Sequence, residues 1–320
     1  MSSNTIKLPE IDFSQLRQKN KTVTWESTKN HVKCALEEFG AFEATFDQIP
    51  QSLRDSVIEW LKQLFELPLS NKVRNTSSKP YHGYIGQSPV VPLYESLGIE
   101  HALEPGCIET FTNLLWSKDY PDSEHKVSSC SKTIQNFSEQ LAELDQMIRK
   151  MVLESLGLEK HIDEHIESSD YVVRIQKYDC PRSGETEIGL VSHTDKNIVT
   201  IVYQNVVNGL EIMTKDGQWI SPQSSPNSFV VFAGESFHTW TNGRLHAPHH
   251  RVMMKGDAIR YSIGLFSVPK DGYIIKAPEE MVDEKHPILF KPYVIAKFLD
   301  FFYSEAGKRS PNPLKEYCRV

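Results

Sequence analysis

The sequence predicts an α+β fold in which a helical N-terminal region precedes a C-terminal half built from two β-sheets, as in a sandwich or jelly roll. Two observations along the chain predict it. Before about residue 165, apolar residues recur at the spacings of three and four that are typical of amphipathic helices. From Tyr171 onward, short apolar runs alternate with turn residues. We therefore expect residues 1–165 to be a helical region packed on a core made by residues 166–320.

Three helices are expected in the N-terminal region. The first ends before Gly40, and one of its faces carries Val32, Ala35, Leu36 and Phe39. The second ends before Pro68, and its apolar residues are Leu53, Val57, Trp60, Leu61 and Leu64. The longest runs from about Thr133 to Leu156 with Gly157 as a C-terminal cap, and its apolar face carries Phe137, Leu141, Leu144, Ile148 and Met151. We expect this long helix to pack on the strands that follow.

Five short strands are expected in the C-terminal half, over residues 171–178, 198–203, 210–213, 229–232 and 260–266. Turn signals lie near several of their ends, namely Asn208-Gly209, Asp216-Gly217 and Asn242-Gly243. The last apolar segment, residues 292–303, again has the spacing of a helix. The predicted order is therefore helices, then a double sheet, then a C-terminal helix.

Charge and cysteine content narrow the classes of function. The 320 residues include 35 basic and 42 acidic side chains, and no block of Lys and Arg could follow a phosphate backbone, so nucleic acid is not an expected partner. No window approaches the roughly 18 apolar residues of a membrane span, and no signal-peptide core is found. The five cysteines lack a CxxC pair, which is typical of reduced thiols. We expect a cytoplasmic monomer that acts on a small molecule.

A candidate metal site begins at Ser192-His193-Thr194-Asp195. In an extended strand, residues two apart project to the same face, so His193 and Asp195 could meet one ion. A third ligand is available 55 residues after Asp195, where the chain carries His249 and His250. Two histidines and one carboxylate on a single face, with the other positions open, select Fe(II) for chemistry with O₂.

A candidate anion site follows ten residues after His250. Arg260-Tyr261-Ser262 places an arginine and a serine on one face of a predicted strand. A guanidinium group can bind a carboxylate through two parallel hydrogen bonds, and a hydroxyl can add a third. An arginine inside a barrel would be costly to bury without such a partner.

In combination, order and spacing, these motifs resemble the plant 2-oxoglutarate-dependent dioxygenases. The residues that carry the resemblance are His193-x-Asp195, His250-Arg251-Val252 and Arg260-x-Ser262. Further runs are similar to the AOP-like branch of that family, namely Pro80-Tyr81-His82-Gly83-Tyr84, Pro92-Leu93-Tyr94-Glu95-Ser96, Phe111-Thr112-Asn113 and Asn242-Gly243-Arg244-Leu245-His246. The resemblance extends over nearly the whole chain.

The resemblance implies a double-stranded β-helix whose strands carry Fe(II) on His193, Asp195 and His250. It implies 2-oxoglutarate as co-substrate on Arg260 and Ser262, with a tyrosine of an earlier strand that matches Tyr178 here. It further implies O₂ as oxidant, succinate and CO₂ as products, and ascorbate as a supporting reductant. The chain departs from the family pattern at Gln176, where Asn is frequent, and in the run Tyr178-Asp179-Cys180-Pro181.

Three histidines compete for the third ligand position. The strand period prevents His249 and His250 from both facing one ion, and His250 is favoured because Arg251-Val252 follows it as in the family. His246 and His249 are then expected at the surface or beside the ligands. Phe266 and Trp240 stand at strand ends near the motifs and are candidates for substrate contact, although core packing is the default for any aromatic residue.

The implied activity is hydroxylation of a small plant specialised metabolite. The same oxidant could instead lead to desaturation, oxidative ring closure or dealkylation, and the sequence does not separate these outcomes. A different class is a non-catalytic jelly-roll protein that binds a small molecule. Such a protein has no need for the metal triad and Arg260 together, and the absence of iron binding would favour it.

Overall fold

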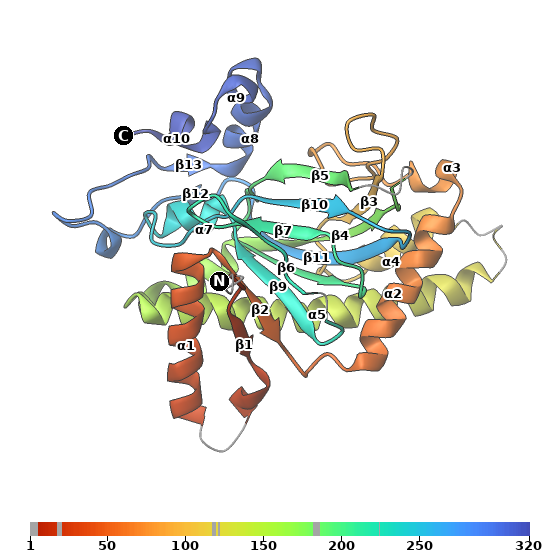
Figure 1. Ribbon diagram of the computed structural model, residues 1–320, viewed down its shortest axis with the longest axis horizontal. Helices are drawn as coiled ribbons and strands as arrows, with labels where there is room; N and C mark the ends of the chain where they lie inside the picture. Colours follow the sequence, from red (N-terminus) through yellow and green to blue (C-terminus); the bar gives the residue numbers. More distant parts are fainter. Residues whose placement is uncertain (1–5, 18–20, 117–119, 121, 182–185, 224) are drawn as a thin grey trace, which may run out of the picture.

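In the computed structural model, a long helix supports a curved double sheet, and the shorter helices surround both (Figure 1). The structure describes residues 6–17, 21–116, 120, 122–181, 186–223 and 225–320. None of the helices in these ranges is long and apolar enough to cross a membrane. The arrangement confirms the predicted α+β class with a jelly-roll core.

The N-terminal region contains both helices and strands. Its elements are β1 (Glu10–Asp12), a 3₁₀ turn (Ser14–Arg17), α1 (Lys21–Glu38), β2 (Ala41–Thr45), α2 (Gln51–Glu66), α3 (Leu69–Lys72), β3 (Tyr94–Ile99), α4 (Cys107–Leu115), α5 (Ser123–Ser155), a second 3₁₀ turn (Glu159–His161) and α6 (Ile162–Glu167). The expected helices are present, and Gly40 and Gly157 end α1 and α5 with positive φ values of 69° and 70°. Helix α5 begins at Ser123 and not near Thr133, because only scattered apolar residues mark its serine-rich first turns.

The C-terminal half supplies most of the strands. Its elements are β4 (Ser169–Tyr178), β5 (Glu187–His193), β6 (Val199–Gln204), β7 (Leu210–Met213), β8 (Trp219–Ile220), β9 (Ser228–Ala233), α7 (Glu235–Trp240), β10 (His250–Met254), β11 (Arg260–Pro269), β12 (Ile274–Ile275), a 3₁₀ turn (Glu279–Met281), β13 (Tyr293–Val294), α8 (Ile295–Tyr303), α9 (Glu305–Arg309) and α10 (Pro313–Cys318). All five expected strands are present. The expected final helix is α8, which starts at Ile295 after the short strand β13.

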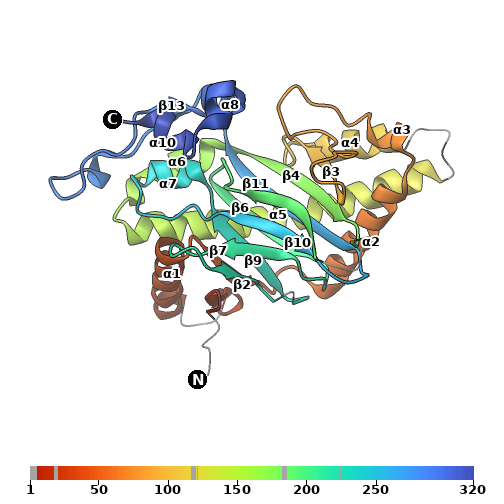
Figure 2. The same ribbon diagram turned by 45° about the horizontal axis from the view of Figure 1, so that its top comes forward.

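Two sheets face each other. The major sheet has the order β1-β2-β9-β6-β11-β4-β3, and the minor sheet has the order β5-β10-β7-β8. Strands β1, β2 and β3 come from the region that the sequence predicted to be only helical. Strand β1 was missed because it has only three residues, and β2 and β3 were missed because most of their residues are buried and show no regular alternation. Because these strands extend the same sheet as β4, β6, β9 and β11, the two halves of the chain form one unit (Figure 2).

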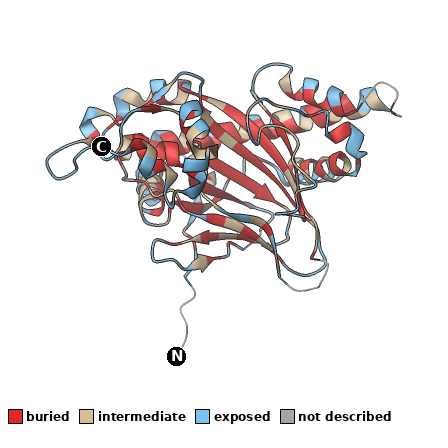
Figure 3. Ribbon diagram, turned by 90° about the horizontal axis from the view of Figure 1, so that it is seen from above, coloured by how far each residue is buried: buried red, intermediate tan, exposed pale blue. Residues whose placement is uncertain are grey.

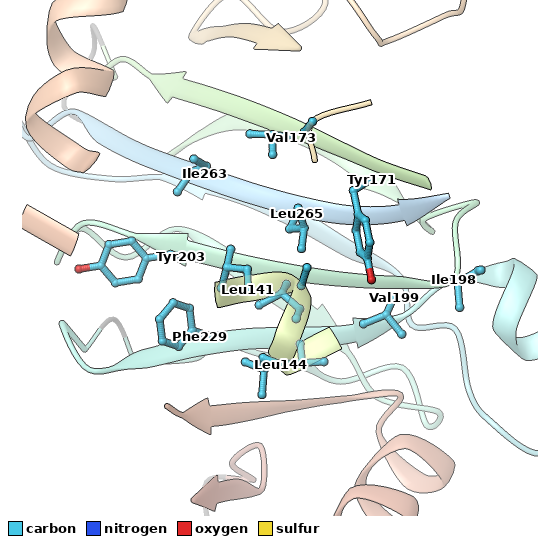
Figure 4. Packing of buried hydrophobic residues seen from close by; sticks show 14 of the residues in the cluster. Leu141, Leu144, Tyr171, Val173, Ile198, Val199, Tyr203, Phe229, Ile263 and Leu265 are labelled. Atoms are coloured by element: carbon cyan, nitrogen blue, oxygen red, sulfur yellow. The ribbon is translucent and has the colours of Figure 1, made fainter. Parts of the chain in front are cut away.

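The largest apolar core lies between the major sheet and the helices. Leu141 and Leu144 of α5 point toward the strands, where they meet side chains such as Tyr203, Phe229 and Leu265 (Figure 4). Buried residues follow the strands and the helix faces turned toward them (Figure 3). Burial of this apolar surface is the main favourable contribution to folding.

A buried polar network fixes α5 to the sheet at one place. The Asp145 carboxylate accepts hydrogen bonds from Tyr171 of β4 and Ser267 of β11, at 2.8 and 3.0 Å, and from Arg149 at 3.3 Å. Arg149 also donates to Ser169 at 2.7 Å. Since each charged group has several partners, the network holds the helix in a single register against β4 and β11.

The opposite face of the major sheet turns inward, toward the minor sheet. Two small apolar clusters lie on that side. One contains Val202, Leu210, Ile212, Val230 and Phe232, and the other contains Leu93, Tyr94, Tyr178, Val252 and Met254. Polar and charged residues of β4, β6 and β11 share this inward face, as described below.

Shortening a buried side chain of the main core should lower the free energy of unfolding. Leu144 is fully buried, so Leu144→Ala should lower the free energy of unfolding by about 2 to 5 kcal/mol. Val206→Ala is the control, because Val206 is 68% exposed and its truncation should change the free energy by less than about 0.5 kcal/mol. Urea unfolding followed by circular dichroism measures both. Equal effects of the two variants would contradict the proposed position of the core.

Candidate active site

Pairing of two strands brings the predicted metal ligands together. His193 is the last residue of β5 and His250 is the first residue of β10, and the antiparallel register places them directly opposite each other. Asp195 follows two residues after His193. Its Oδ1 lies 3.7 Å from His193 Nε2 and 3.6 Å from His250 Nε2. The three side chains form one group whose ligand atoms all lie within 4.8 Å of one another.

Hydrogen bonds orient His193 and Asp195, and an aromatic contact orients His250. Nδ1 of His193 lies 2.8 Å from the carbonyl oxygen of Val191, so a proton on Nδ1 leaves Nε2 available to an ion. The Thr200 hydroxyl donates to Asp195 Oδ2 at 2.5 Å, which leaves Oδ1 turned toward the histidines. The ring of Phe232 stacks on His250 with centroids 4.8 Å apart.

The loop that carries Asp195 lies against the start of α7. The backbone N–H of Glu235 donates to the Asp195 carbonyl oxygen at 2.8 Å. A Cβ atom at Gly234 would lie only 2.1 Å from the carbonyl oxygen of Asn197, so the close approach requires glycine. This contact was not predicted from the sequence, and it ties the loop of Asp195 to α7.

The donor set fits a divalent ion that prefers nitrogen and oxygen. Desolvation and the neighbouring His250 lower the pKa of His193 to about 4, so the ring is neutral at pH 7 as a ligand must be. Ligands about 2.1 Å from an ion and at right angles would be about 3 Å apart, so the observed separations need little adjustment. Two imidazoles and one carboxylate on one side of an ion suit Fe(II).

The competing histidines lie elsewhere. His249 is exposed, as the strand period predicts for the neighbour of a buried His250, and neither it nor His246 belongs to the group around Asp195. His246 is half-buried, and desolvation lowers its pKa to about 4.

Arg260 lies on the inward face of β11 and is almost fully buried. Its Nη1 donates to Ser262 Oγ at 3.2 Å, and its guanidinium carbon lies 4.9 Å from the centroid of the Tyr178 ring. Burial raises the pKa of Tyr178, so the phenol keeps its proton and can donate. The register places Arg260 opposite Tyr178 and Ser262 opposite Gln176. The three predicted anion ligands are therefore neighbours.

Sequence reasoning missed one partner of this arginine. Gln204, the last residue of β6, accepts from both Nε and Nη2 of Arg260 through its side-chain oxygen. Gln176, where the family pattern frequently has Asn, accepts from Ser262 Oγ at 3.2 Å. The available signal was Gln204, which directly follows the predicted strand 198–203, together with Arg260 at the start of another predicted strand. It was not used because strand order is not evident from the sequence.

The two aromatic candidates differ in position. Phe266 lies on the same face of β11 as Arg260 and Ser262 and opposite Thr200, which bonds Asp195. Trp240 was a candidate for substrate contact, but this expectation is corrected. Its ring packs in the main core against His161, His165 and Phe237. Its place at the end of α7 turns it toward α6 and not toward the ligand group.

Helix α8 lies over the mouth of the barrel next to the ligand group. The ring of Phe302 lies under the Lys196 ammonium group, 4.6 Å from it, and Lys196 directly follows Asp195. The adjacent Tyr303 packs on Tyr81 with centroids 5.8 Å apart. Beside Tyr81 and Tyr303 is an open cavity of about 630 Å³. It is lined by Pro80, Tyr81, Ile85, Asp300, Tyr303 and Ser304.

Comparison with known proteins gives consistent matches over the chain. Residues 169–269 match the model of the 2OG-Fe(II) oxygenase superfamily, and residues 8–105 match a model described as non-haem dioxygenase in morphine synthesis, N-terminal. The probable 2-oxoglutarate-dependent dioxygenase AOP1.2 of Arabidopsis thaliana is 48% identical, with 99% of this chain and 97% of that protein aligned.

Two solved structures of auxin-oxidising dioxygenases are similar in fold and sequence. The rice dioxygenase for auxin oxidation superposes with a TM-score of 0.81 at 25% identity, covering 98% of this chain and all of that one. The Arabidopsis thaliana enzyme, solved as a complex with 2-oxoglutarate, gives a TM-score of 0.75 at 26% identity and covers 88% and 99% of the two chains.

The ligand assignment is tested by removing one histidine at a time. His250→Ala should abolish stoichiometric Fe(II) binding, because it removes an imidazole whose Nε2 faces Asp195. His249→Ala is the matched control and should bind Fe(II) as the unchanged protein does, since its side chain is exposed. Anaerobic calorimetric titration with Fe(II) measures both. The assignment is wrong if His249→Ala loses the ion and His250→Ala keeps it.

Loss of the hydroxyl that holds Asp195 should weaken metal binding without abolishing it. Thr200→Val keeps the shape of the side chain but removes the 2.5 Å hydrogen bond, so Fe(II) affinity should fall about tenfold to a hundredfold. Thr241→Val is the control, because that buried hydroxyl bonds only within and next to α7. The same titration applies, and equal affinities of the two variants would show that Thr200 does not orient the ligand.

Proposed function

Since the chain belongs to the 2OG-Fe(II) oxygenase superfamily and is a 2-oxoglutarate-dependent dioxygenase, we propose that His193, Asp195 and His250 hold its Fe(II) ion. The observation that carries this proposal is the convergence of Nε2, Oδ1 and Nε2 from the paired ends of β5 and β10. Iron with 2-oxoglutarate and O₂ supplies the oxidant that removes hydrogen from the substrate, with release of succinate and CO₂.

Arg260, Ser262 and Tyr178 bind the far carboxylate of 2-oxoglutarate in this proposal. Support comes from their common position on the inward face, where a buried guanidinium group lies beside two hydroxyl groups. Gln204 holds Nε and Nη2, so the second N–H of Nη1 and the Tyr178 hydroxyl are left for the anion, and Ser262 would turn its hydroxyl from Gln176 to the anion. The protein's part is to place the co-substrate between this group and the ion.

Hydroxylation of a small plant metabolite is the outcome that we propose. Phe266 lies opposite Thr200, the residue that donates to Asp195. It provides an apolar contact for the substrate beside the metal ligands. Desaturation, ring closure and dealkylation use the same oxidant. Anaerobic assembly with Fe(II) and 2-oxoglutarate, followed by exposure to O₂ with candidate metabolites, distinguishes these outcomes. A product heavier by one oxygen atom indicates hydroxylation, and a product lighter by two hydrogens indicates desaturation or closure.

The alternative of a non-catalytic jelly-roll protein is not favoured. The chain aligns with a probable 2-oxoglutarate-dependent dioxygenase over nearly the full length of both chains, which argues against it. The predicted ligand groups argue against it as well. Within the proposal, the enzyme is a cytoplasmic monomer whose activity ascorbate supports. All five cysteines are free, which supports a reducing compartment.

The fork geometry of Arg260 should be hard to replace. Arg260→Lys keeps the charge but cannot bond Gln204 and the anion together, so the KM for 2-oxoglutarate should rise more than the KM for the organic substrate. Each charge-assisted bond contributes about 1.5 to 3 kcal/mol, which corresponds to a rise of about tenfold to a hundredfold. Ser262→Ala should have a smaller effect, because one neutral donor is lost. Steady-state kinetics measure the constants, and an unchanged KM in Arg260→Lys would remove Arg260 from the co-substrate site.

A further inference from the structure

A second arginine, Arg174, lies on the inward face of the major sheet. Along β4, Val173 and Ile175 are buried in the core under the helices, so the side chains of Arg174, Gln176 and Tyr178 project to the other side. That side is the one on which the register places Ser262 and Arg260. Arg174 is 8% exposed, and so a second positive charge is buried in the same barrel.

Arg174 is not satisfied by the protein. Its Nη2 donates to Ser96 Oγ, but its buried Nη1 has no hydrogen-bond partner, and no carboxylate of the described residues forms an ion pair with it. Among the other buried arginines, Arg149 is paired with Asp145 and Arg260 with Gln204, whereas Arg54 of α2, outside the barrel, also has one unpartnered atom, Nε. A buried guanidinium without an anion is unfavourable, so its presence requires an explanation.

Both strands that neighbour Arg174 carry glycine in the same row. Arg174 is opposite Gly98 of β3 and opposite Gly264 of β11. A Cβ atom at Gly98 would overlap the carbonyl oxygen of His82 and lie 3.2 Å from Arg174 Nη1, and one at Gly264 would lie 2.8 Å from the Phe266 ring. Any larger side chain in this row would therefore crowd the charged group or displace the aromatic ring.

The position relative to the metal group suits a small substrate. Gly264, opposite Arg174, is two residues from Phe266, which is opposite Thr200, and Thr200 bonds Asp195. Strands lie about 4.8 Å apart, and residues on one face repeat every 6.7 Å or so, so the Cα atoms of Arg174 and Thr200 are about 12 Å apart. A molecule anchored at Arg174 could pass over Phe266 and place a carbon atom near the ligand group.

The cavity at α8 adjoins the segment that pairs with Ser96. Ile85 lines that cavity and is joined to Ser96 by two backbone hydrogen bonds of 2.9 and 2.7 Å. Ser96 is the residue whose hydroxyl accepts from Arg174. His82, on the same segment as Ile85, is paired with Glu100 at 2.9 Å, so this carboxylate is directed to His82 and not to Arg174.

We propose that Arg174 binds a carboxylate of the organic substrate, and that the enzyme therefore acts on small carboxylic acids whose apolar part packs on Phe266. The proposal rests on the proposed function, in which iron is held by the His193 group and 2-oxoglutarate by Arg260. A single guanidinium group without an anionic partner can bind one carboxylate through charge-assisted hydrogen bonds. It binds an uncharged amide or ester more weakly.

The test compares acids with their uncharged amides. Phenylacetate, 3-phenylpropanoate and decanoate are titrated by calorimetry into anaerobic enzyme loaded with Fe(II) and saturating 2-oxoglutarate, each beside its primary amide. We expect at least one acid to bind about tenfold or more tightly than its amide. In Arg174→Met this preference should be lost while the amide binds unchanged, and Arg174→Lys should retain part of it.

Arg54→Met is the matched control for loss of a buried guanidinium group. Arg54 lies on α2, is 6% exposed and also has an unpartnered Nε atom, but it faces Asn227 and not the barrel interior. Arg54→Met should prefer the acid over its amide by the same factor as the unchanged enzyme.

Two results would overturn the proposal while leaving the proposed function intact. One is that no acid of the set binds more tightly than its amide. The other is that Arg174→Met keeps the preference. In both cases the unchanged enzyme would still bind Fe(II) and 2-oxoglutarate, and Arg174→Met would bind 2-oxoglutarate with the same dissociation constant. Failure of the proposed function would be recognised separately, because the unchanged enzyme would then bind neither Fe(II) nor 2-oxoglutarate.

Discussion

The active site depends on one constraint, the antiparallel pairing of β5 with β10 that places His193 opposite His250. Neither histidine could meet Asp195 without it, because the two residues are far apart in the sequence. The pairing also fixes which side of each strand faces inward. A shift by one residue would turn His250 outward and His249 inward, and it would destroy the ligand group. The hydrogen bond from Thr200 and the contact at Gly234 then adjust a geometry that the strands have already set.

Much of the fold could be predicted from local pattern, and the exceptions have physical causes. Strand β7 has its predicted bounds, Leu210–Met213, and the helix-ending glycines Gly40 and Gly157 have the positive φ values that their positions suggest. Strand β5 was not predicted, because most of its residues are partly exposed and no alternation marks it. Trp240 was misplaced because proximity to a motif along the chain does not show which side of a helix faces the site.

The parts of the site that depend on residues close together in the sequence could be predicted. Arg260 and Ser262 are two residues apart on β11, so their common direction follows from strand geometry. His193 ends β5 and Asp195 lies in the loop that follows, so their spacing suggested the pair, but the loop contacts complete it. Gln204 and Arg174 depend on which strands are neighbours, and this information lies in the sheet order. The barrel holds two buried arginines on one face, and they differ in how the protein satisfies them. Gln204 and Ser262 bond the first, whereas the second keeps a donor without a partner.

Strand β5 has a further property that follows from its position in the minor sheet. Among the described strands it is an edge strand that pairs only with β10, and Ile188 and Val191 on it are exposed. Strands with one bonded neighbour and little apolar burial open at a lower free energy than the rest of a domain. In the proposed site, an ion held by His193 and His250 would be a second link between the same two strands, so its binding energy would add to the free energy of local opening there. Amide hydrogens of β5 should thus exchange more slowly as iron occupancy rises, and the strand that supplies the ligand is also the one that the metal stabilises most.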